Sequence, residues 1–315
     1  MSFVGEVLEI VADENIPRHQ IPNRLTSVER RLMEYLSRNK KLITCIGNIG
    51  AGKSSLVKFL AYHTGLNALF ELPDEGFEDH LISNTALYPL LATAKDSAKR
   101  TLWKYYTAIN EFISCQAREP VEGPAWMTAK KHLERASLDI QHAYLDLRKM
   151  QLQAFGHLQG STCVDGYPMA DRYAFCEVLH RDMDVSYLTR EAIALIDERL
   201  EKEFKPLPQP DLLILLKGPV DELLKNIGER ERKEEKLEGE SQGEQNIPEG
   251  LVRLVRALDG HYNNFIDTLR KTGWYLGPAL LIDVSKIDFV SNVRHLIAVF
   301  EAIEKLLVPK DFKVH

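Results

Sequence analysis

Three glycines separate an apolar run from an amphipathic run in the segment LITCIGNIGAGKSSLVKFL, which begins at Leu42. The run from Leu42 to Ile46 is typical of a short buried strand, and apolar residues recur at helical spacing from Ser54 to Tyr62. Because Gly47, Gly50 and Gly52 lack a Cβ, the backbone between the two runs can curl tightly and point its N–H groups at an anion. The spacing fits G-x-x-x-x-G-K-[ST], which predicts a phosphate-binding loop between a strand and a helix.

This loop predicts a site for a nucleoside triphosphate. Lys53 is expected to reach the β- and γ-phosphates and Ser54 to bind Mg²⁺, while backbone amides and the start of the helix hold phosphate oxygens. The alternative is a glycine-rich turn that binds nothing, and the strand and helix on either side argue against it. The candidate nucleotide-binding residues are Gly47, Asn48, Ile49, Gly50, Ala51, Gly52, Lys53, Ser54 and Ser55.

Composition excludes several classes of protein. The 315 residues are 44% hydrophobic and 27% charged, with a formal net charge of -6, which argues against a general nucleic-acid binder. No apolar run approaches the ~20 residues that span a bilayer, and the N-terminus lacks the pattern of a signal peptide. We therefore expect a cytoplasmic protein without a membrane segment.

The four cysteines and ten histidines form no metal-binding motif, so we predict no structural metal. Cys45 and Cys163 lie in apolar runs, so we predict that their thiols are buried.

Short apolar strands alternate with long helical segments along the chain. This order predicts a parallel sheet covered on both faces. Glu71, Asp165 and the glycine loop all follow predicted strands, so they are expected to meet at the carboxyl edge of the sheet, where ligands bind. The expected strands are 42–46, 66–70, 161–165, 212–216 and 280–284; the expected helices are 27–39, with Ser27 as N-cap, 54–62, and most of 79–155 with a break near 115–126.

A charged tract without an apolar face covers residues 229–246. One interpretation is a solvated helix end followed by a loop. The other is a lid that closes over the phosphates, because Arg230 and Arg232 could stabilise the charge that develops on a transferred phosphoryl group. The presence of a predicted phosphate-binding loop in the same chain favours the lid over the solvated loop.

Several of these residues, in this order, resemble the deoxynucleoside kinases. The stretch IGNIGAGKSSL is similar to the first motif of that family. LFELP is similar to a strand that ends in Glu-Pro, whose glutamate is the general base, and this implies that role for Glu71, although Leu72 interrupts the pair. A literal Glu-Pro-Val at 119–121 lies too far from the loop, within helical sequence.

The resemblance also nominates residues for the nucleoside. QLQAF is similar to the helix whose glutamine reads the base edge, which implies Gln153, with Gln151 as a competitor and an ordinary structural glutamine as the alternative. VDGYPMADRYAF is similar to the family's strand-end acid and its Asp-Arg-Tyr-x-Phe, which implies the following roles: Asp165 near Mg²⁺, Asp171 and Arg172 at the substrate, and Phe175 stacked on the base.

One departure from the family pattern is clear. The family has Arg-Ser after the strand-end acid, whereas this chain has Gly166 and Tyr167. The family's arginine contacts the catalytic glutamate and the phosphate region, so Arg172 or a lid arginine would have to replace it. RERKEE resembles the family's lid motif and implies roles for Arg230, Arg232 and Glu235, the last at the substrate.

The resemblance covers residues 42–305 and implies a P-loop nucleoside kinase-like three-layer α/β sandwich. Its implied ligands are ATP, Mg²⁺ and a nucleoside phosphorylated at its 5′-hydroxyl, and its implied assembly is a homodimer. A nucleoside monophosphate kinase and a non-catalytic nucleotide-binding module remain alternatives; a GTPase lacks support because D-x-x-G and N-K-x-D are missing. The expected organisation is a mostly helical extension (1–40), a kinase domain (41–308) with a helical insert (76–140) and a lid (228–248), and a tail (309–315).

Overall fold

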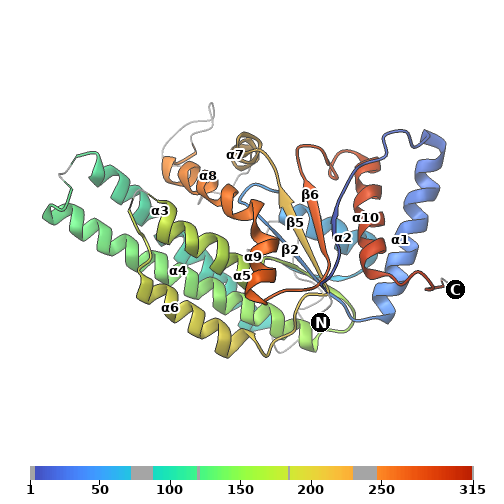
Figure 1. Cartoon of the computed structure of the whole chain (residues 1–315), viewed down its shortest axis with the longest axis horizontal. Helices are drawn as coiled ribbons and strands as arrows, with labels where there is room; N and C mark the ends of the chain where they lie inside the picture. The colour runs from blue at the N-terminus through green and yellow to red at the C-terminus, as the bar shows by residue number, and fades with distance from the viewer. Residues whose placement is uncertain (1–3, 72–87, 119–120, 184, 230–246, 314–315) are drawn as a thin grey trace.

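A six-stranded parallel sheet forms the centre of the molecule (Figure 1). The computed structural model describes residues 4–71, 88–118, 121–183, 185–229 and 247–313. The strands are β1 (Val7–Glu9), β2 (Leu42–Gly47), β3 (Asn67–Leu69), β4 (Thr162–Asp165), β5 (Leu212–Lys217) and β6 (Ala279–Asp283), in the spatial order β1-β6-β5-β2-β4-β3. Every residue of β2, β3 and β4 is buried, as expected for strands covered on both faces.

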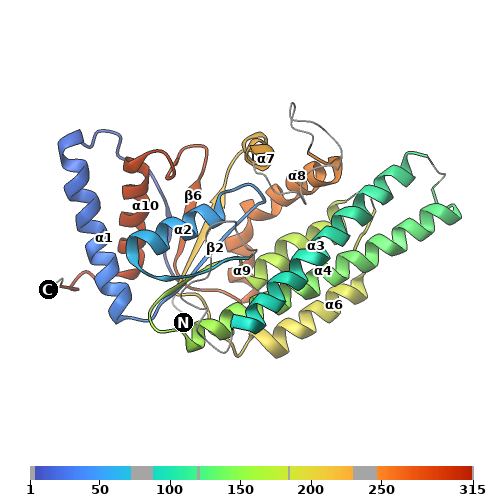
Figure 2. The ribbon, with the colours of Figure 1, turned by 180° about the vertical axis from the view of Figure 1, so that it is seen from behind.

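Helices cover the sheet on both faces, which confirms the predicted α/β class. The main helices are α1 (Ile21–Arg38), α2 (Lys53–Thr64), α3 (Tyr88–Gln116), α4 (Pro124–His157), α6 (Arg190–Arg199), α7 (Val220–Glu229), α8 (Glu249–Asn263), α9 (Phe265–Thr272) and α10 (Val293–Leu307). A short helix α5 (Pro168–Ala170) leads into two π-helical segments, η2 (Asp171–Cys176) and η3 (Val178–Asp182). Viewed from both sides, α1 and α10 lie at one end of the molecule, and α3 and α4 lie at the other (Figures 1 and 2).

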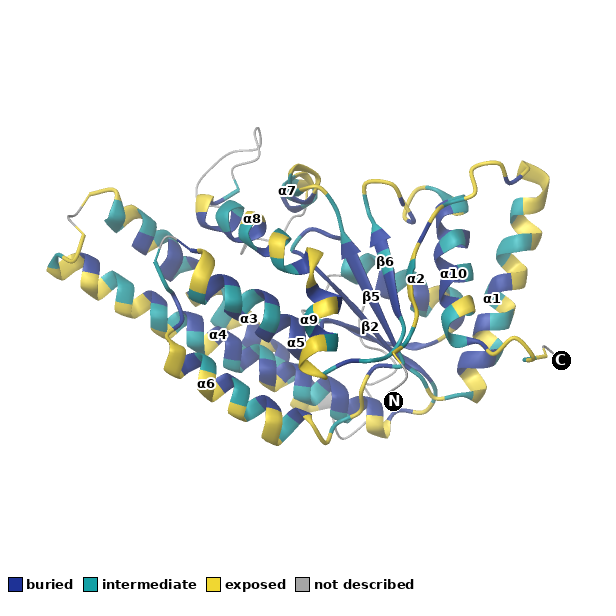
Figure 3. Ribbon diagram, in the orientation of Figure 1, coloured by how far each residue is buried: buried dark blue, intermediate teal, exposed yellow. Residues whose placement is uncertain are grey.

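The α3–α4 pair is a long antiparallel hairpin that extends away from the sheet (Figure 2). Its inner face is dark with buried residues while its outer face is exposed (Figure 3). Phe112 and Trp126 pack against each other across the hairpin, with ring centroids 5.7 Å apart. The break predicted near residues 115–126 is confirmed at the turn between these helices.

The N-terminal segment corrects two expectations. A strand, β1, precedes the helix and pairs with β6 at the edge of the sheet; its three residues are largely exposed, so no run of buried apolar residues reveals it in the sequence. The helix α1 begins at Ile21 and not at Ser27, because Pro22 occupies its first turn, where a missing N–H costs nothing. The helix packs against α10, with an ion pair of 2.5 Å between Arg31 and Glu304.

The strand β2 lies between β5 and β4, where the chain order reverses. Its register places Cys45 opposite Asp165 on β4 and Gly47 opposite Leu216 on β5. In such sheets the crevice outside the carboxyl ends at the reversal is the usual place for a ligand. Both Cys45 and Cys163 are buried, as predicted. Within the described residues, no helix is long and apolar enough to cross a membrane.

Candidate functional site

The glycine loop joins β2 to α2 with the backbone conformation that its sequence predicts. Gly47, Gly50 and Gly52 have φ values of +152°, +85° and +85°, which L side chains rarely adopt. A Cβ on Gly47 would lie 2.3 Å from the carbonyl oxygen of Leu216, and one on Gly50 would lie equally close to that of Leu223. Glycine is therefore required here by the close approach of β5 and α7 as well as by the turn.

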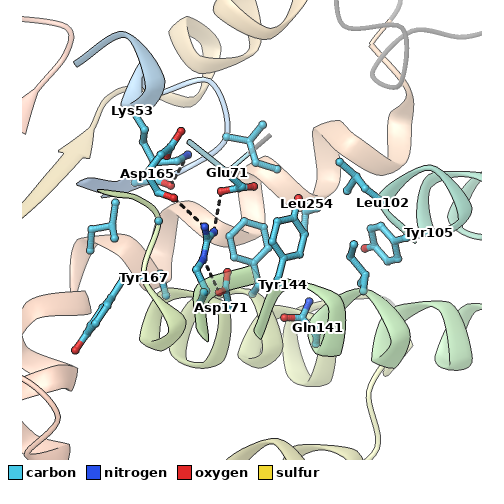
Figure 4. Close-up of a pocket in the computed structure, with 18 of the residues that line it drawn as sticks. Lys53, Glu71, Leu102, Tyr105, Gln141, Tyr144, Asp165, Tyr167, Asp171 and Leu254 are labelled. Carbon is cyan, nitrogen blue, oxygen red and sulfur yellow. Dashed lines mark hydrogen bonds and ion pairs between the residues drawn. The ribbon is translucent and has the colours of Figure 1, made fainter. Parts of the chain in front are cut away.

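Side chains fix this loop from its outer side. The Asn48 amide donates a hydrogen bond of 2.9 Å to the Val255 carbonyl on α8, and its oxygen accepts one from the Ile49 N–H. Asn226 on α7 donates to the Gly50 carbonyl at 3.0 Å. With the outer side held in this way, the loop and the N-terminus of α2 form one wall of a cavity, into which Lys53 also faces (Figure 4). A helix N-terminus next to a lysine is a favourable place for phosphate.

Asp165, at the end of β4, lies beside this loop. Its carboxylate accepts a hydrogen bond of 2.6 Å from the Ser54 hydroxyl, while its other oxygen, Oδ1, is buried without a hydrogen-bond partner among the described residues. Burial raises the pKa of Asp165. An unpartnered carboxylate oxygen next to a hydroxyl is a donor set that suits Mg²⁺, so the predicted pair Ser54 and Asp165 fits this ion. The described residues contain no cluster of three His, Cys, Asp or Glu that could hold a metal, so phosphate oxygens and water would have to complete its coordination.

Glu71 follows β3 and enters the same cavity from the neighbouring strand (Figure 4). Its carboxylate accepts a hydrogen bond of 2.8 Å from Nη2 of Arg148, on α4. The structure thus brings together Lys53, Ser54, Glu71 and Asp165, which the sequence analysis nominated from three separate segments. They meet because β2, β3 and β4 are parallel neighbours and each contributes its carboxyl end.

Arg148 is the residue that the sequence analysis missed. Its side chain is only 3% exposed. The guanidinium donates to Glu71 at 2.8 Å, to Asp171 at 3.1 Å, to the Asp165 carbonyl at 2.8 Å and to Gln151 at 3.2 Å. A signal was present in the sequence, because Gln141, Tyr144 and Arg148 recur at helical spacing and so place polar groups on one face of α4.

The charges in this cavity do not balance. Lys53 and Arg148 face three carboxylates, those of Glu71, Asp165 and Asp171. Arg148 stabilises the ionised form of Asp171, but burial has the larger effect and raises the pKa of Asp171 to about 6. The site therefore has one carboxyl group, that of Asp171, whose protonation changes near pH 6, and its carboxylates outnumber its cations among the described residues.

Several aromatic residues line the cavity, and the part that they line is called its aromatic end below. Tyr105, Tyr144, Phe175 and Tyr262 come from four elements, α3, α4, η2 and α8. The buried Tyr105 hydroxyl has no hydrogen-bond partner among the described residues. Gln141 also lines this end, and its oxygen accepts a hydrogen bond from the Cys176 thiol at 3.4 Å. Flat walls with a few polar groups can hold an aromatic ring and contact its polar edge.

The structure corrects the predicted base-reading glutamine. Gln151 is buried and donates to the Phe70 carbonyl at 3.1 Å while accepting from Arg148, so it supports the end of β3. Gln153 is half-buried and is not one of the residues that line the cavity. The reason is helical phase: Gln153 lies five residues beyond Arg148, which turns it well away from the face that carries Gln141.

Arg172 is also displaced from its predicted place. Its guanidinium pairs with Asp197 on α6 and with Glu177 at 2.6 Å, and it does not line the cavity. Asp171 and Phe175 do line it. Side chains four apart share one face of a helical turn, whereas the next residue points elsewhere. Ser55 is half-buried on α2 and is not among the lining residues, while Arg230, Arg232 and Glu235 lie outside the described residues.

Similarity to known proteins extends over most of this chain. A family model described as deoxynucleoside kinase matches residues 43–308. A curated deoxyadenosine kinase from Lactobacillus acidophilus is 22% identical over 267 residues, which is 85% of this chain and 96% of the relative. Two structures of deoxyadenosine kinase from M. mycoides, one with bound dATP and one with the products dCMP and a flexible dCDP, each cover 84% of this chain at 17% identity. They are covered over 99% and 98% of their own lengths, with TM-scores of 0.48 and 0.49.

The raised pKa of Asp171 predicts a pH-dependent stability. Between the ordinary value of 3.8 and about 6, the folded protein binds a proton that the unfolded chain has released. The contribution of this group to the free energy of unfolding is therefore complete below pH ~4 and is lost as the pH rises through ~6. We expect the free energy of unfolding of the wild type, minus that of Asp171→Asn, to fall across this interval and to level off above it.

Chemical denaturation at a series of pH values measures this difference. Asp146→Asn is the matched control, because Asp146 is 61% exposed and pairs with Arg199 away from the cavity. A difference between wild type and Asp171→Asn that does not change with pH would contradict the prediction.

Proposed function

Because this chain belongs to the deoxynucleoside kinase family, we propose that it transfers the γ-phosphoryl group of ATP to the 5′-hydroxyl of a deoxynucleoside. The observation that carries the proposal is one cavity that contains a phosphate-binding loop, a candidate magnesium pair and a carboxylate at the adjacent strand end. A phosphate loop alone would fit any nucleotide-binding protein. Glu71 opposite the loop supplies what an alcohol acceptor requires, a base for its proton.

The loop would bind the donor. Its amides and the α2 N-terminus would hold phosphate oxygens, and Lys53 would reach the β- and γ-phosphates. Mg²⁺ held by Ser54 and Asp165 would neutralise charge on the same oxygens. Lys53 donates to the carbonyls of Gly47 and Asn48, both at 3.2 Å. A bound triphosphate would offer the ammonium group charged partners in their place.

On the acceptor side, the 5′-oxygen would form a bond to the γ-phosphorus as the bond from that phosphorus to the bridging oxygen of ADP breaks. The hydroxyl proton would go to Glu71. Little covalent chemistry is needed from the protein, so the rate depends on alignment and on neutralised charge. We assign the contact with the base to Gln141 and Phe175 in place of Gln153, because both line the aromatic end of the cavity.

Other features of the proposal rest on the family resemblance. Arg230 and Arg232, with Glu235, would close over the donor and acceptor from a lid at 228–248. The family match over 43–308 supports a kinase domain at 41–308. A cytoplasmic homodimer is implied by the resemblance alone, whereas the net charge of -6 supports free nucleosides over nucleic acid as the acceptor.

A substrate panel tests the proposal directly. The purified chain is incubated with ATP, Mg²⁺ and each of the four deoxynucleosides, their ribonucleoside counterparts and the corresponding monophosphates, and ADP and the phosphorylated product are measured. We expect a deoxynucleoside 5′-monophosphate as product. Turnover of monophosphates alone would favour a nucleoside monophosphate kinase, and ATP binding without transfer to any acceptor would favour a non-catalytic nucleotide-binding module.

The phosphate loop gives the next prediction. Lys53→Ala is expected to lower kcat by roughly 10²–10³, the scale for removing one preorganised electrostatic group. The melting temperature should change little, since the bonds that fix the loop come from Asn48 and Asn226. Lys58→Ala, further along α2, is the matched control. Wild-type kcat in Lys53→Ala would exclude the assigned donor site.

The general base gives a separate prediction. Glu71→Gln keeps the shape of the side chain but cannot accept the proton, so we expect kcat to fall by ~10²–10⁴. The KM for ATP should stay within about threefold, because the donor side is untouched. Glu203→Gln is a suitable control, since Glu203 pairs with Lys149 and Arg199 and not with a cavity residue. A kcat close to that of the wild type would remove Glu71 from the mechanism.

A further inference from the structure

The position after the strand-end acid has an unusual environment. Gly166 has a φ of +100°, and a Cβ built on it would lie 2.2 Å from Cζ of Arg148 and 2.2 Å from Nη2. Real Cβ atoms essentially never approach other heavy atoms so closely. The guanidinium of Arg148 thus fills the space into which any side chain at position 166 would begin to grow.

We infer that Arg148, reaching in from α4, is the positioning residue for Glu71, and that Gly166 is a glycine because it gives this guanidinium its place. The inference rests on the proposed role of Glu71 as the base. It also explains the departure from the family motif: the arginine absent after the strand-end acid is supplied by a helix that lies earlier in the chain. Asp165, Gly166 and Arg148 therefore form one structural unit.

Besides the bond to Gln151, three contacts hold the guanidinium against Glu71. The Asp165 carbonyl accepts from Nη1 at 2.8 Å, Asp171 accepts from Nε at 3.1 Å, and the Tyr144 ring lies 5.5 Å from Cζ. Nη2 donates to Glu71 at 2.8 Å. Because these bonds use a planar group with fixed directions, the Glu71 carboxylate has one preferred orientation. Lysine could preserve the charge, but it could not preserve the geometry.

The alternative considered from sequence was Arg172. That side chain is 8% exposed and is held by Glu177 and Asp197, so moving it to Glu71 would take the cation from the Asp197 pair and leave Glu177 with Arg181 alone. Its own position on η2 directs it away from the cavity. Arg148 is the arginine that contacts Glu71 within the part of the chain that the structure describes.

A pair of alanine substitutions separates this space-filling role from ordinary glycine strain. Gly166→Ala introduces a methyl group into the guanidinium as well as strain at a positive φ. Gly160→Ala introduces strain alone, because Gly160 has a φ of +80° and its Cβ would meet nothing within 4 Å. We expect Gly166→Ala to lower the melting temperature by several degrees more than Gly160→Ala.

The double variant shows whether Arg148 causes that difference. In an Arg148→Met background, the excess cost of Gly166→Ala should disappear, because the flexible thioether can move aside. An excess that is unchanged in this background would overturn the inference. This cycle measures stability and needs no activity, so it remains decisive even if the substrate panel finds no phosphorylated nucleoside and the proposed function fails.

Kinetics test the positioning of Glu71. Arg148→Lys and Gly166→Ala should each lower kcat roughly 10²-fold, the scale for a reacting group displaced by about 1 Å, with the KM for ATP changed less than about threefold. Arg199→Met is the control, because Arg199 joins α4 to α6 through Asp146 and Glu203 and does not line the cavity. If Arg199→Met lowered kcat to the same extent, the loss would come from a general loosening of α4, and the inference would be overturned.

The pH profile supplies a readout that a purely structural role would not change. Glu71 shares the cavity with the cations Arg148 and Lys53 and with Asp165, Asp171, Tyr144 and Tyr262. Replacing Arg148 by Met removes the cation bonded to Glu71 and leaves Lys53 among these acids and phenols, so the acidic limb of kcat/KM should move to higher pH in Arg148→Met and should stay in place in Arg199→Met. If Arg148→Met fails to fold, Gly166→Ala should show a smaller shift in the same direction. Wild-type kcat and an unshifted limb in the folded variants would overturn the inference, whereas a wild type that phosphorylates no nucleoside would overturn the proposed function instead.

Discussion

Parallel pairing of β2 with β4, and of β4 with β3, is the constraint on which the site depends. The register places Cys45 opposite Asp165 and Leu69 opposite Val164, so the loop after β2, the acid at the end of β4 and the acid after β3 emerge at the same edge. Side chains alternate between faces along a strand, and a slip of one residue would turn Asp165 into the packing layer. The buried Leu, Ile and Val of these strands therefore hold the chemistry in place as well as the core.

Because the three strand ends emerge at one edge of the sheet, their charged side chains are also brought together. Among the described residues, two cations and three acids share the cavity, and burial together with the nearby Glu71 raises the pKa of Asp171 to about 6. A triphosphate would add several more negative charges. The proposed donor complex therefore needs further positive charge, from Mg²⁺ beside Asp165 and from the lid arginines that the family resemblance implies. We therefore expect an acid-rich cavity of this kind to bind a nucleotide only together with its cations.

Local signals in the sequence predicted the loop, the buried strands and the acids at their ends, because glycine spacing and apolar runs are readable over a few residues. Features held by distant partners were harder to predict. The strand β1 exists through its pairing with β6, and Arg172 could be separated from Arg148 only by knowing which face of each helical turn points inward. Gln153 lies outside the cavity for the same reason, because its position along α4 turns it away from the face that lines the cavity. Arg148 lay on a face that already held Gln141 and Tyr144, and that pattern would have been the better guide to the site.

Because Arg148 lies on a helix and not at a strand end, it shares one rigid element with other residues that line the cavity. Gln141, Tyr144 and Arg148 lie on one face of α4 within two helical turns, which is a span of about 10 Å. The residue assigned to the base and the residue that orients Glu71 therefore belong to one rigid element. With the proposed roles, a base that displaces Gln141 or Tyr144 would strain the bond from Arg148 to Glu71, so recognition of the base would be coupled mechanically to alignment of the acceptor hydroxyl. Binding energy from the base would in this way be used at the reacting oxygen, and we expect a nucleoside that fits poorly to react slowly as well as to bind weakly.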